Sequence, residues 1–106
     1  EPGHLAYGPY ATDWPGTTLV ADFRLLIDVR DDRTEVVATI EVYDQSLDEI
    51  VSQQDIRRAD FRVANRYQNF TLSFDMAERA GHSMETRVYW HDISALRIDR
   101  VTVRMP

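Results

Sequence analysis

Alternation of apolar and polar residues runs through most of this chain, and it constrains the fold more than any other feature of the sequence. The clearest example is residues 84–91, where Met84, Thr86, Val88 and Trp90 alternate with Glu85, Arg87, Tyr89 and His91. A period of two residues is that of a β-strand with one buried face and one solvated face. The same pattern predicts strands over residues 17–28, 35–44 and 67–75.

The segments between these strands carry turn chemistry. Residues 29–33 form a charged turn, with charged residues at positions 30–33, which predicts that the strands at 17–28 and 35–44 form a hairpin. A short first strand is expected near the amino end, followed by a proline- and glycine-containing turn at 13–16. Three aromatic residues are then expected on or near irregular backbone, where they can face a ligand or cap the core: Tyr7, Tyr10 and Trp14.

Residues 47–66 allow two interpretations. Leu47, Ile50 and Val51 fit one turn of an amphipathic helix, but the apolar stripe is short. A strand over Glu49–Ile56, followed by an irregular segment anchored by Phe61, fits the neighbouring segments better. We therefore favour a strand.

The last strand contains a change of phase. Leu96 and Ile98 share one parity, whereas Val101 and Val103 share the other. An unbroken strand would expose one of the two pairs, so we expect a β-bulge near Asp99.

Several short strands without a convincing helix predict an all-β, antiparallel sandwich or barrel. The 106 residues, of which 43% are hydrophobic, suit one domain spanning 1–106. No run approaches the roughly 18 apolar residues of a membrane helix, so membrane insertion is not expected.

Charge and composition limit the partners. A formal net charge of -6 argues against a nucleic-acid or anionic-membrane partner, whereas a neutral ligand stays compatible. All 12 basic residues are arginine, which can mean planar bidentate recognition or simply genomic base composition. The absence of cysteine does not fix the compartment, although an extracellular location is favoured.

Nothing in the sequence indicates catalysis. The three histidines, at positions 4, 82 and 91, lack metal-ligand spacing. There is no nucleophile elbow or phosphate loop, and no pair of carboxylates stands out for glycoside cleavage. We expect a protein that is not an enzyme.

The order of several short segments resembles a small carbohydrate-binding module. The segments are Tyr-Gly-Pro-Tyr (7–10), Ala-Asp-Phe-Arg-Leu (21–25), Ile-Glu-Val-Tyr-Asp (40–44), Tyr-Gln-Asn-Phe-Thr-Leu-Ser-Phe (67–74), Met-Glu-Thr-Arg-Val-Tyr-Trp (84–90) and Leu-Arg-Ile-Asp-Arg-Val-Thr-Val (96–103). The chain is similar over nearly its whole length to the galactose-binding-like jelly-roll superfamily, particularly to modules of the family six and family thirty-five type.

This resemblance implies a jelly-roll β-sandwich that binds an oligo- or polysaccharide through loops or a sheet face and belongs to a larger glycan-active protein. It also implies a structural calcium ion between the first and last strands, with Asp99 matching a ligand position. The acidic Glu-x-Glu start of such modules is missing, and only Glu1 is available there. The alternative for Asp99 is a carboxylate that accepts amide hydrogen bonds at the bulge.

A sugar site needs aromatic rings for the apolar face of a pyranose and polar groups for its hydroxyls. The candidate residues are Tyr7, Tyr10, Tyr43, Glu85, Arg87, Tyr89, Trp90 and His91. The same residues can instead form cross-strand ion pairs and packing contacts, and the parity of Trp90 also suits the core. The competing hypothesis is a protein-interaction or structural β-sandwich domain of a larger protein.

Overall fold

The computed structural model describes residues 3–10, 18–28, 35–77, 79, 81–91 and 96–106, with only the backbone of residues 3–10. Its elements are β1 (Gly3–Tyr10), β2 (Thr18–Ile27), β3 (Val36–Asp44), β4 (Glu49–Arg57), the short 3₁₀ helix η1 (Arg58–Asp60), β5 (Gln68–Asp75), β6 (Met84–Trp90) and β7 (Leu96–Arg104). Within this described part no helix is long and apolar enough to cross a membrane.

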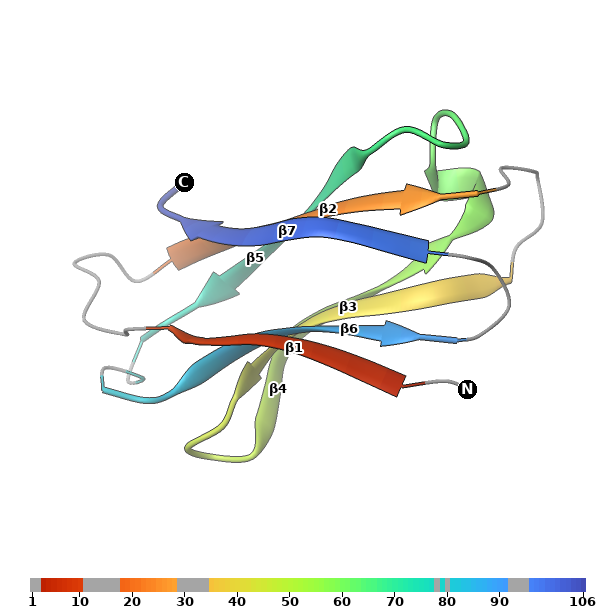
Figure 1. Cartoon of the computed structure of the whole chain (residues 1–106). Coiled ribbons are helices and arrows are strands. Elements are labelled where there is room, and N and C mark those ends of the chain that lie inside the picture. The colour runs from red at the N-terminus through yellow and green to blue at the C-terminus, as the bar shows by residue number, and fades with distance from the viewer. Residues whose placement is uncertain (1–2, 11–17, 29–34, 78, 80, 92–95) are drawn as a thin grey trace.

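The strands form two antiparallel sheets, which lie as two layers in Figure 1. One sheet has the order β1-β6-β3-β4, and the other has the order β5-β2-β7. The prediction of an all-β fold is therefore confirmed, and the arrangement is compatible with a β-sandwich.

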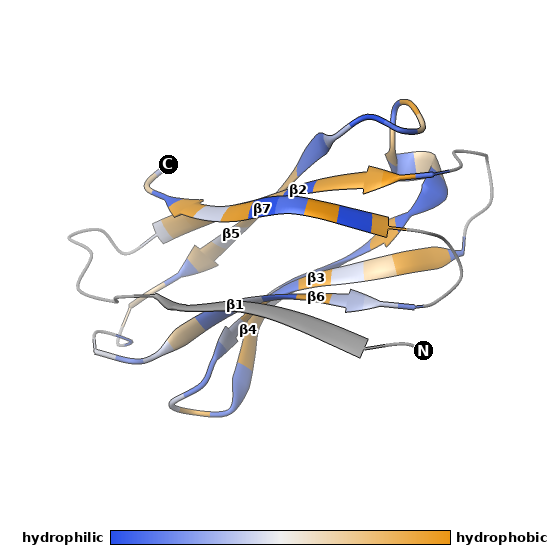
Figure 2. Cartoon of the chain, viewed as in Figure 1, coloured by the Kyte–Doolittle hydropathy of each residue, from blue (hydrophilic) through white to orange (hydrophobic). Residues whose placement is uncertain are grey.

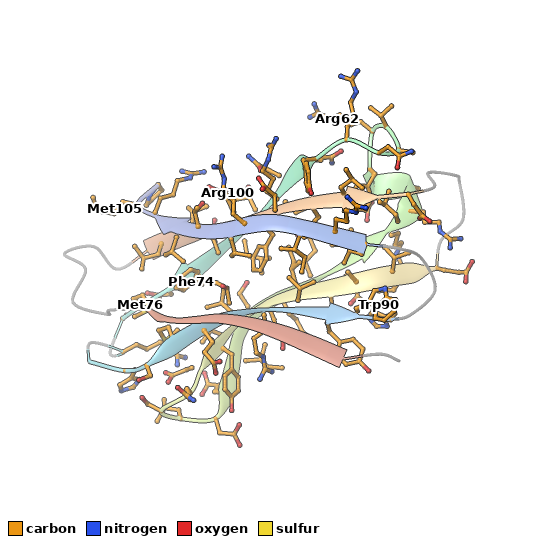
Figure 3. The ribbon with its side chains drawn as sticks, in the orientation of Figure 1. Arg62, Phe74, Met76, Trp90, Arg100 and Met105 are labelled. Atoms are coloured by element: carbon orange, nitrogen blue, oxygen red, sulfur yellow. The ribbon has the colours of Figure 1, made fainter. Side chains whose placement is uncertain are left out.

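Alternating residues of both sheets meet in one hydrophobic core. Strand β2 buries Leu19, Ala21, Phe23, Leu25 and Ile27, and β5 buries Phe70, Leu72 and Phe74. Figure 3 shows Phe74 between the two layers. The inward phases predicted for these strands are correct because each residue pair of a pleated strand sends one side chain to each face.

The predicted hairpin of residues 17–28 and 35–44 is wrong. Strand β2 pairs with β5 and β7, whereas β3 pairs with β4 and β6 in the other sheet. Both strands bury one face in the shared core, but from opposite layers. Alternation specifies which face of a strand is buried and carries no information about the neighbouring strand, so it could not detect that the chain changes sheets here.

The segment at 47–66, which allowed a helix or a strand, begins with a strand, so the favoured interpretation is confirmed. Strand β4 covers Glu49–Arg57, and the irregular segment that follows is anchored by Phe61, which is 1% exposed. The ring of Phe61 packs edge-to-face on Phe70, with centroids 4.9 Å apart. Phe61 therefore holds the connection between β4 and β5 against the core.

The predicted bulge in the last strand is also confirmed. Arg24 of β2 faces Arg100, but the next residue, Leu25, faces Ile98. Asp99 is the additional residue between them. The bulge brings both apolar pairs of β7 to the core side, where they pack against buried residues.

Candidate functional site

The outer surface of strands β3 and β6 gathers most of the predicted binding residues. In the register of these strands, Thr39 faces Tyr89, Glu41 faces Arg87, and Tyr43 faces Glu85. The intervening residues Ile40, Val42 and Val88 are buried in the core. We call the opposite surface the outer β3–β6 face and define it as Thr39, Glu41, Tyr43, Glu85, Arg87, Tyr89 and His91.

Arg87 lies at the centre of this face. Its Nε and Nη2 atoms are 2.7 and 2.6 Å from Oε1 of Glu41. Its guanidinium carbon is 4.0 Å from the centroid of the Tyr43 ring, which is a cation–π contact. Glu41 is only 3% exposed although it points away from the core, because its neighbours on the sheet surface cover it. The result is a shielded ion pair beside an accessible ring.

Tyr43 is fixed at its hydroxyl end. The phenol donates a hydrogen bond to Oδ1 of Asp48, a residue of the β3–β4 turn with a positive φ of 52°. This hydrogen bond to a carboxylate raises the pKa of Tyr43 above its usual value, because loss of the phenolic proton would place two anions together. The ring is thus held between Arg87 and the turn, and it remains partly exposed.

A second ring group lies at the other end of the face. Thr39 donates its hydroxyl proton to Asp55 at 2.8 Å, and its oxygen is 2.9 Å from Nε2 of His91. Since the hydroxyl proton goes to Asp55, the oxygen accepts from His91. The His91 ring packs edge-to-face on Tyr89, with centroids 4.9 Å apart. Tyr89 and His91 are both partly exposed.

The two ring groups are separated along the sheet. Tyr43 and Tyr89 belong to adjacent strands and lie four register positions apart. At about 3.4 Å per residue, this corresponds to roughly 14 Å, with the Glu41–Arg87 pair between them. A surface of this length can contact more than one residue of a linear glycan.

Trp90 is not part of this surface. It is in register with Ala38, a core residue, and it shares the face of buried Val88. It lies at the end of β6, where it remains partly exposed (Figure 3). Its parity therefore placed it correctly on the core side, and a role of Trp90 in sugar binding stays a prediction that would need access from the end of the sandwich.

Tyr7 and Tyr10 lie within strand β1, next to an irregularity in its pairing with β6, so the expectation that they lie on or near irregular backbone is confirmed. Their Cα positions are in register with Thr86 and Met84, and the pairing shifts between the two tyrosines. Their side chains lie outside the described part of the structure, as does Trp14 altogether. The predicted role of Tyr7 and Tyr10 therefore stays a prediction.

Sequence reasoning missed the groups that β4 and its turn contribute. Asp48 and Asp55 orient Tyr43 and Thr39, but their roles depend on the β3–β4 pairing. The phase of Thr39, Glu41 and Tyr43 was the available signal, because these residues alternate with buried positions. This phase identified the outer face of the strand but not the hydrogen-bond partners Asp48 and Asp55.

A separate pocket lies on the other sheet. It has a volume of about 410 Å³ and is lined by Arg24, Arg62, Val63, Arg66, Tyr67, Gln68 and Asn69. Arg24 lies over the Tyr67 ring at 5.4 Å. Sequence reasoning did not predict this pocket, because its residues come from β2, from the connection between β4 and β5 and from the start of β5.

Asp99 has cationic neighbours. Its Oδ2 atom is 3.0 Å from Nε of Arg24 and 4.0 Å from Nε of Arg100. Within the described residues, no group of three histidine or acidic side chains could hold a metal ion. A calcium ion at Asp99 would compete with these guanidinium groups for Oδ2, and the role of Asp99 as a calcium ligand stays a prediction.

No protein-family model matches the chain, and no match was found among curated proteins or solved structures. The resemblance to carbohydrate-binding modules therefore stays a prediction, and the function must be argued from the geometry.

Proposed function

We propose that this chain is a non-catalytic carbohydrate-binding domain that holds a glycan on the outer β3–β6 face. One observation carries the proposal. Partly exposed rings at Tyr43 and Tyr89 flank a cross-strand ion pair between Glu41 and Arg87 on a single sheet surface.

The chemistry of the face suits a sugar. A pyranose presents C–H groups on its faces, which gain by covering an aromatic ring, and hydroxyl groups on its rim. Arg87 supplies donors, His91 offers the ring nitrogen that does not bond Thr39, and Glu85 supplies acceptors beside Tyr43. Asp48 holds the Tyr43 ring and Thr39 holds the His91 ring before any ligand binds, which reduces the conformational entropy lost on binding.

The strand order supports a jelly-roll sandwich as the scaffold. A jelly roll contains eight strands in two sheets, and the described orders β1-β6-β3-β4 and β5-β2-β7 agree with seven of these eight strands. A single domain over 1–106 is part of the proposal, supported by one core cluster that both sheets share.

The test is a titration with a panel of neutral and acidic oligosaccharides, followed by tryptophan and tyrosine fluorescence and by calorimetry. We expect saturable binding that weakens about tenfold or more in Tyr43→Ala and in Tyr89→Ala, a loss of about 1.4 kcal/mol or more each. Thermal melts establish that both variants are folded.

Tyr67→Ala is the matched control, because Tyr67 precedes β5 and is exposed beside Arg24 of the other sheet. It should leave the affinity unchanged. A failure to bind across the whole panel would reject the proposal and favour a protein-interaction domain. Weaker binding in Tyr67→Ala alone would move the site to the pocket around Arg24.

A further inference from the structure

Strand β7 is an edge of the three-stranded sheet. Among the described residues it pairs with β2 alone. Strands β4 and β5 are in contact, so the two sheets meet along that side, whereas β7 and β1 are the strands at the other side, toward the viewer in Figure 1. Four strands therefore face three, and no described strand of the smaller sheet lies opposite β1.

The core side of β7 is incompletely covered. Its inward residues are all partly exposed, whereas the inward residues of the neighbouring β2 are buried. Figure 2 shows these hydrophobic positions of β7 alternating with hydrophilic ones. The inward residues of β7 are Leu96, Ile98, Val101 and Val103. A strand added beside β7 would remove apolar area from water along this row.

The outer side of β7 carries an excess of positive charge. Asp22 is paired with Arg104 at 2.6 Å, and Asp99 is paired with Arg24 at 3.0 Å. The remaining charges on the outer row of β7 are Arg97 and Arg100, both exposed, with Arg100 4.0 Å from the already paired Asp99. Figure 3 shows Arg100 directed away from the facing sheet. This excess is unusual on a chain whose net charge is -6.

We propose that the free edge of β7 binds an extended, acidic polypeptide strand. The added strand runs antiparallel to β7, places apolar residues toward the core at alternate positions, and places carboxylates beside Arg97 and Arg100. Every pair of the described strands is antiparallel. Backbone hydrogen bonds supply part of the affinity, and the side chains supply the specificity. The smaller sheet then has as many strands as the larger one.

Charge argues against a second copy of this chain as the occupant. Antiparallel pairing of two β7 edges would place Arg97 and Arg100 of one copy beside the same row of the other. Like charges facing each other across strands are destabilising. A strand with acidic residues on its outer face converts the same positions into favourable pairs, so the structure favours an acidic partner strand.

The experiment uses a labelled peptide as long as β7, nine residues, in which valine and glutamate alternate. Fluorescence anisotropy measures binding, and amide hydrogen exchange followed by NMR locates it. We expect saturable binding and slower exchange of β7 amides. A peptide with lysine in place of glutamate should bind about tenfold more weakly.

Arg97→Glu/Arg100→Glu should reverse this preference and favour the lysine peptide. Arg62→Glu/Arg66→Glu is the matched control, because it changes the net charge by the same amount at the pocket around Arg24. It should leave the preference for glutamate intact. Circular dichroism melts verify that both variants fold.

The proposal would be overturned if both double variants changed the peptide preference equally. It would also be overturned if the glutamate peptide left the exchange of the β7 amides unchanged. A dimer that forms in sedimentation without peptide and protects β7 amides would assign the edge to a second copy instead. Glycan affinity should not change in Arg97→Glu/Arg100→Glu, so this test is independent of the sugar site on the outer β3–β6 face.

Discussion

The guanidinium of Arg87 stacks on the ring of Tyr43, with its central carbon 4.0 Å from the ring centroid, while two of its nitrogens contact Glu41. These residues come from β3 and β6, which are separated by 46 positions along the chain at the Glu41–Arg87 pair. Arg87 of β6 therefore contacts both the Tyr43 ring and the Glu41 carboxylate of the neighbouring strand β3.

Replacement of Arg87 should destabilise the fold as well as the site. Arg87→Ala removes a partner from Glu41, which is 3% exposed, and we expect the free energy of unfolding to fall by about 1–3 kcal/mol. Arg87→Lys should lose less, because the charge remains although the planar stacking is gone. Urea unfolding of both variants, and of Glu41→Gln and the Glu41→Gln/Arg87→Ala pair, measures the coupling. Additive effects would contradict a direct interaction.

A buried carboxylate at Asp44 predicts a pH dependence of stability. Its Oδ2 atom is 2.7 Å from Nη1 of Arg79 and 2.8 Å from Nδ1 of His82, and Asp44 is 0% exposed. Burial by itself raises the pKa of Asp44. The hydrogen bonds from His82, Arg79 and the Leu47 amide outweigh this effect, so the pKa of Asp44 lies below its usual value.

The sign follows from the lowered pKa. Above about pH 5 both folded and unfolded chains carry an ionised Asp44, and the stabilisation is complete. As the pH falls below about 4, the unfolded chain binds the proton first, so stability declines toward the folded-state pKa. Chemical unfolding at several pH values between 6 and 3 measures the decline.

The variant Asp44→Asn should be less stable than the parent at pH 6 by about 2–4 kcal/mol, because Arg79 and His82 lose their shared anion. The free energy of unfolding of Asp44→Asn should also decline less on acidification than that of the parent. The control Asp55→Asn alters an exposed carboxylate with a hydrogen bond to Thr39, and it should keep the parent profile. An Asp44→Asn profile parallel to that of the parent would contradict this assignment.

The anchor at Phe61 predicts a large packing effect. Phe61 is 1% exposed and packs on Phe70 at 4.9 Å. Phe61→Ala should reduce the free energy of unfolding by about 3–5 kcal/mol, because it leaves a cavity under the connection between β4 and β5. Phe61→Leu should lose less than half of that. Val63→Ala, at a site 54% exposed, is the nearby control and should change stability by no more than about 0.5 kcal/mol.

The role of Asp99 can be tested by metal removal. Because Asp99 pairs with Arg24, we expect the same melting midpoint with chelator and with millimolar calcium. Asp99→Asn should cost about 0–1 kcal/mol, as for other exposed ion pairs. A midpoint that rises with calcium in the parent and not in Asp99→Asn would instead support the structural calcium ion that the family resemblance implies.

Local pattern was sufficient for the strands and for their buried faces. The alternation in residues 67–75 and 84–90 predicted which side chains enter the core, and the phase change after Ile98 predicted the bulge at Asp99. These features depend on the period of a pleated backbone, which is a property of each segment by itself.

The tertiary structure alone decided which strands are neighbours. The strands at 17–28 and 35–44 looked like a hairpin and belong to different sheets, and the contact of Glu41 with Arg87 exists only because β3 lies beside β6. Pairing partners are distant in sequence, and the two-residue period is the same whichever strand lies alongside. The sequence therefore determined the two faces of each strand, whereas the long-range packing of the sheets determined which polar residues share a surface.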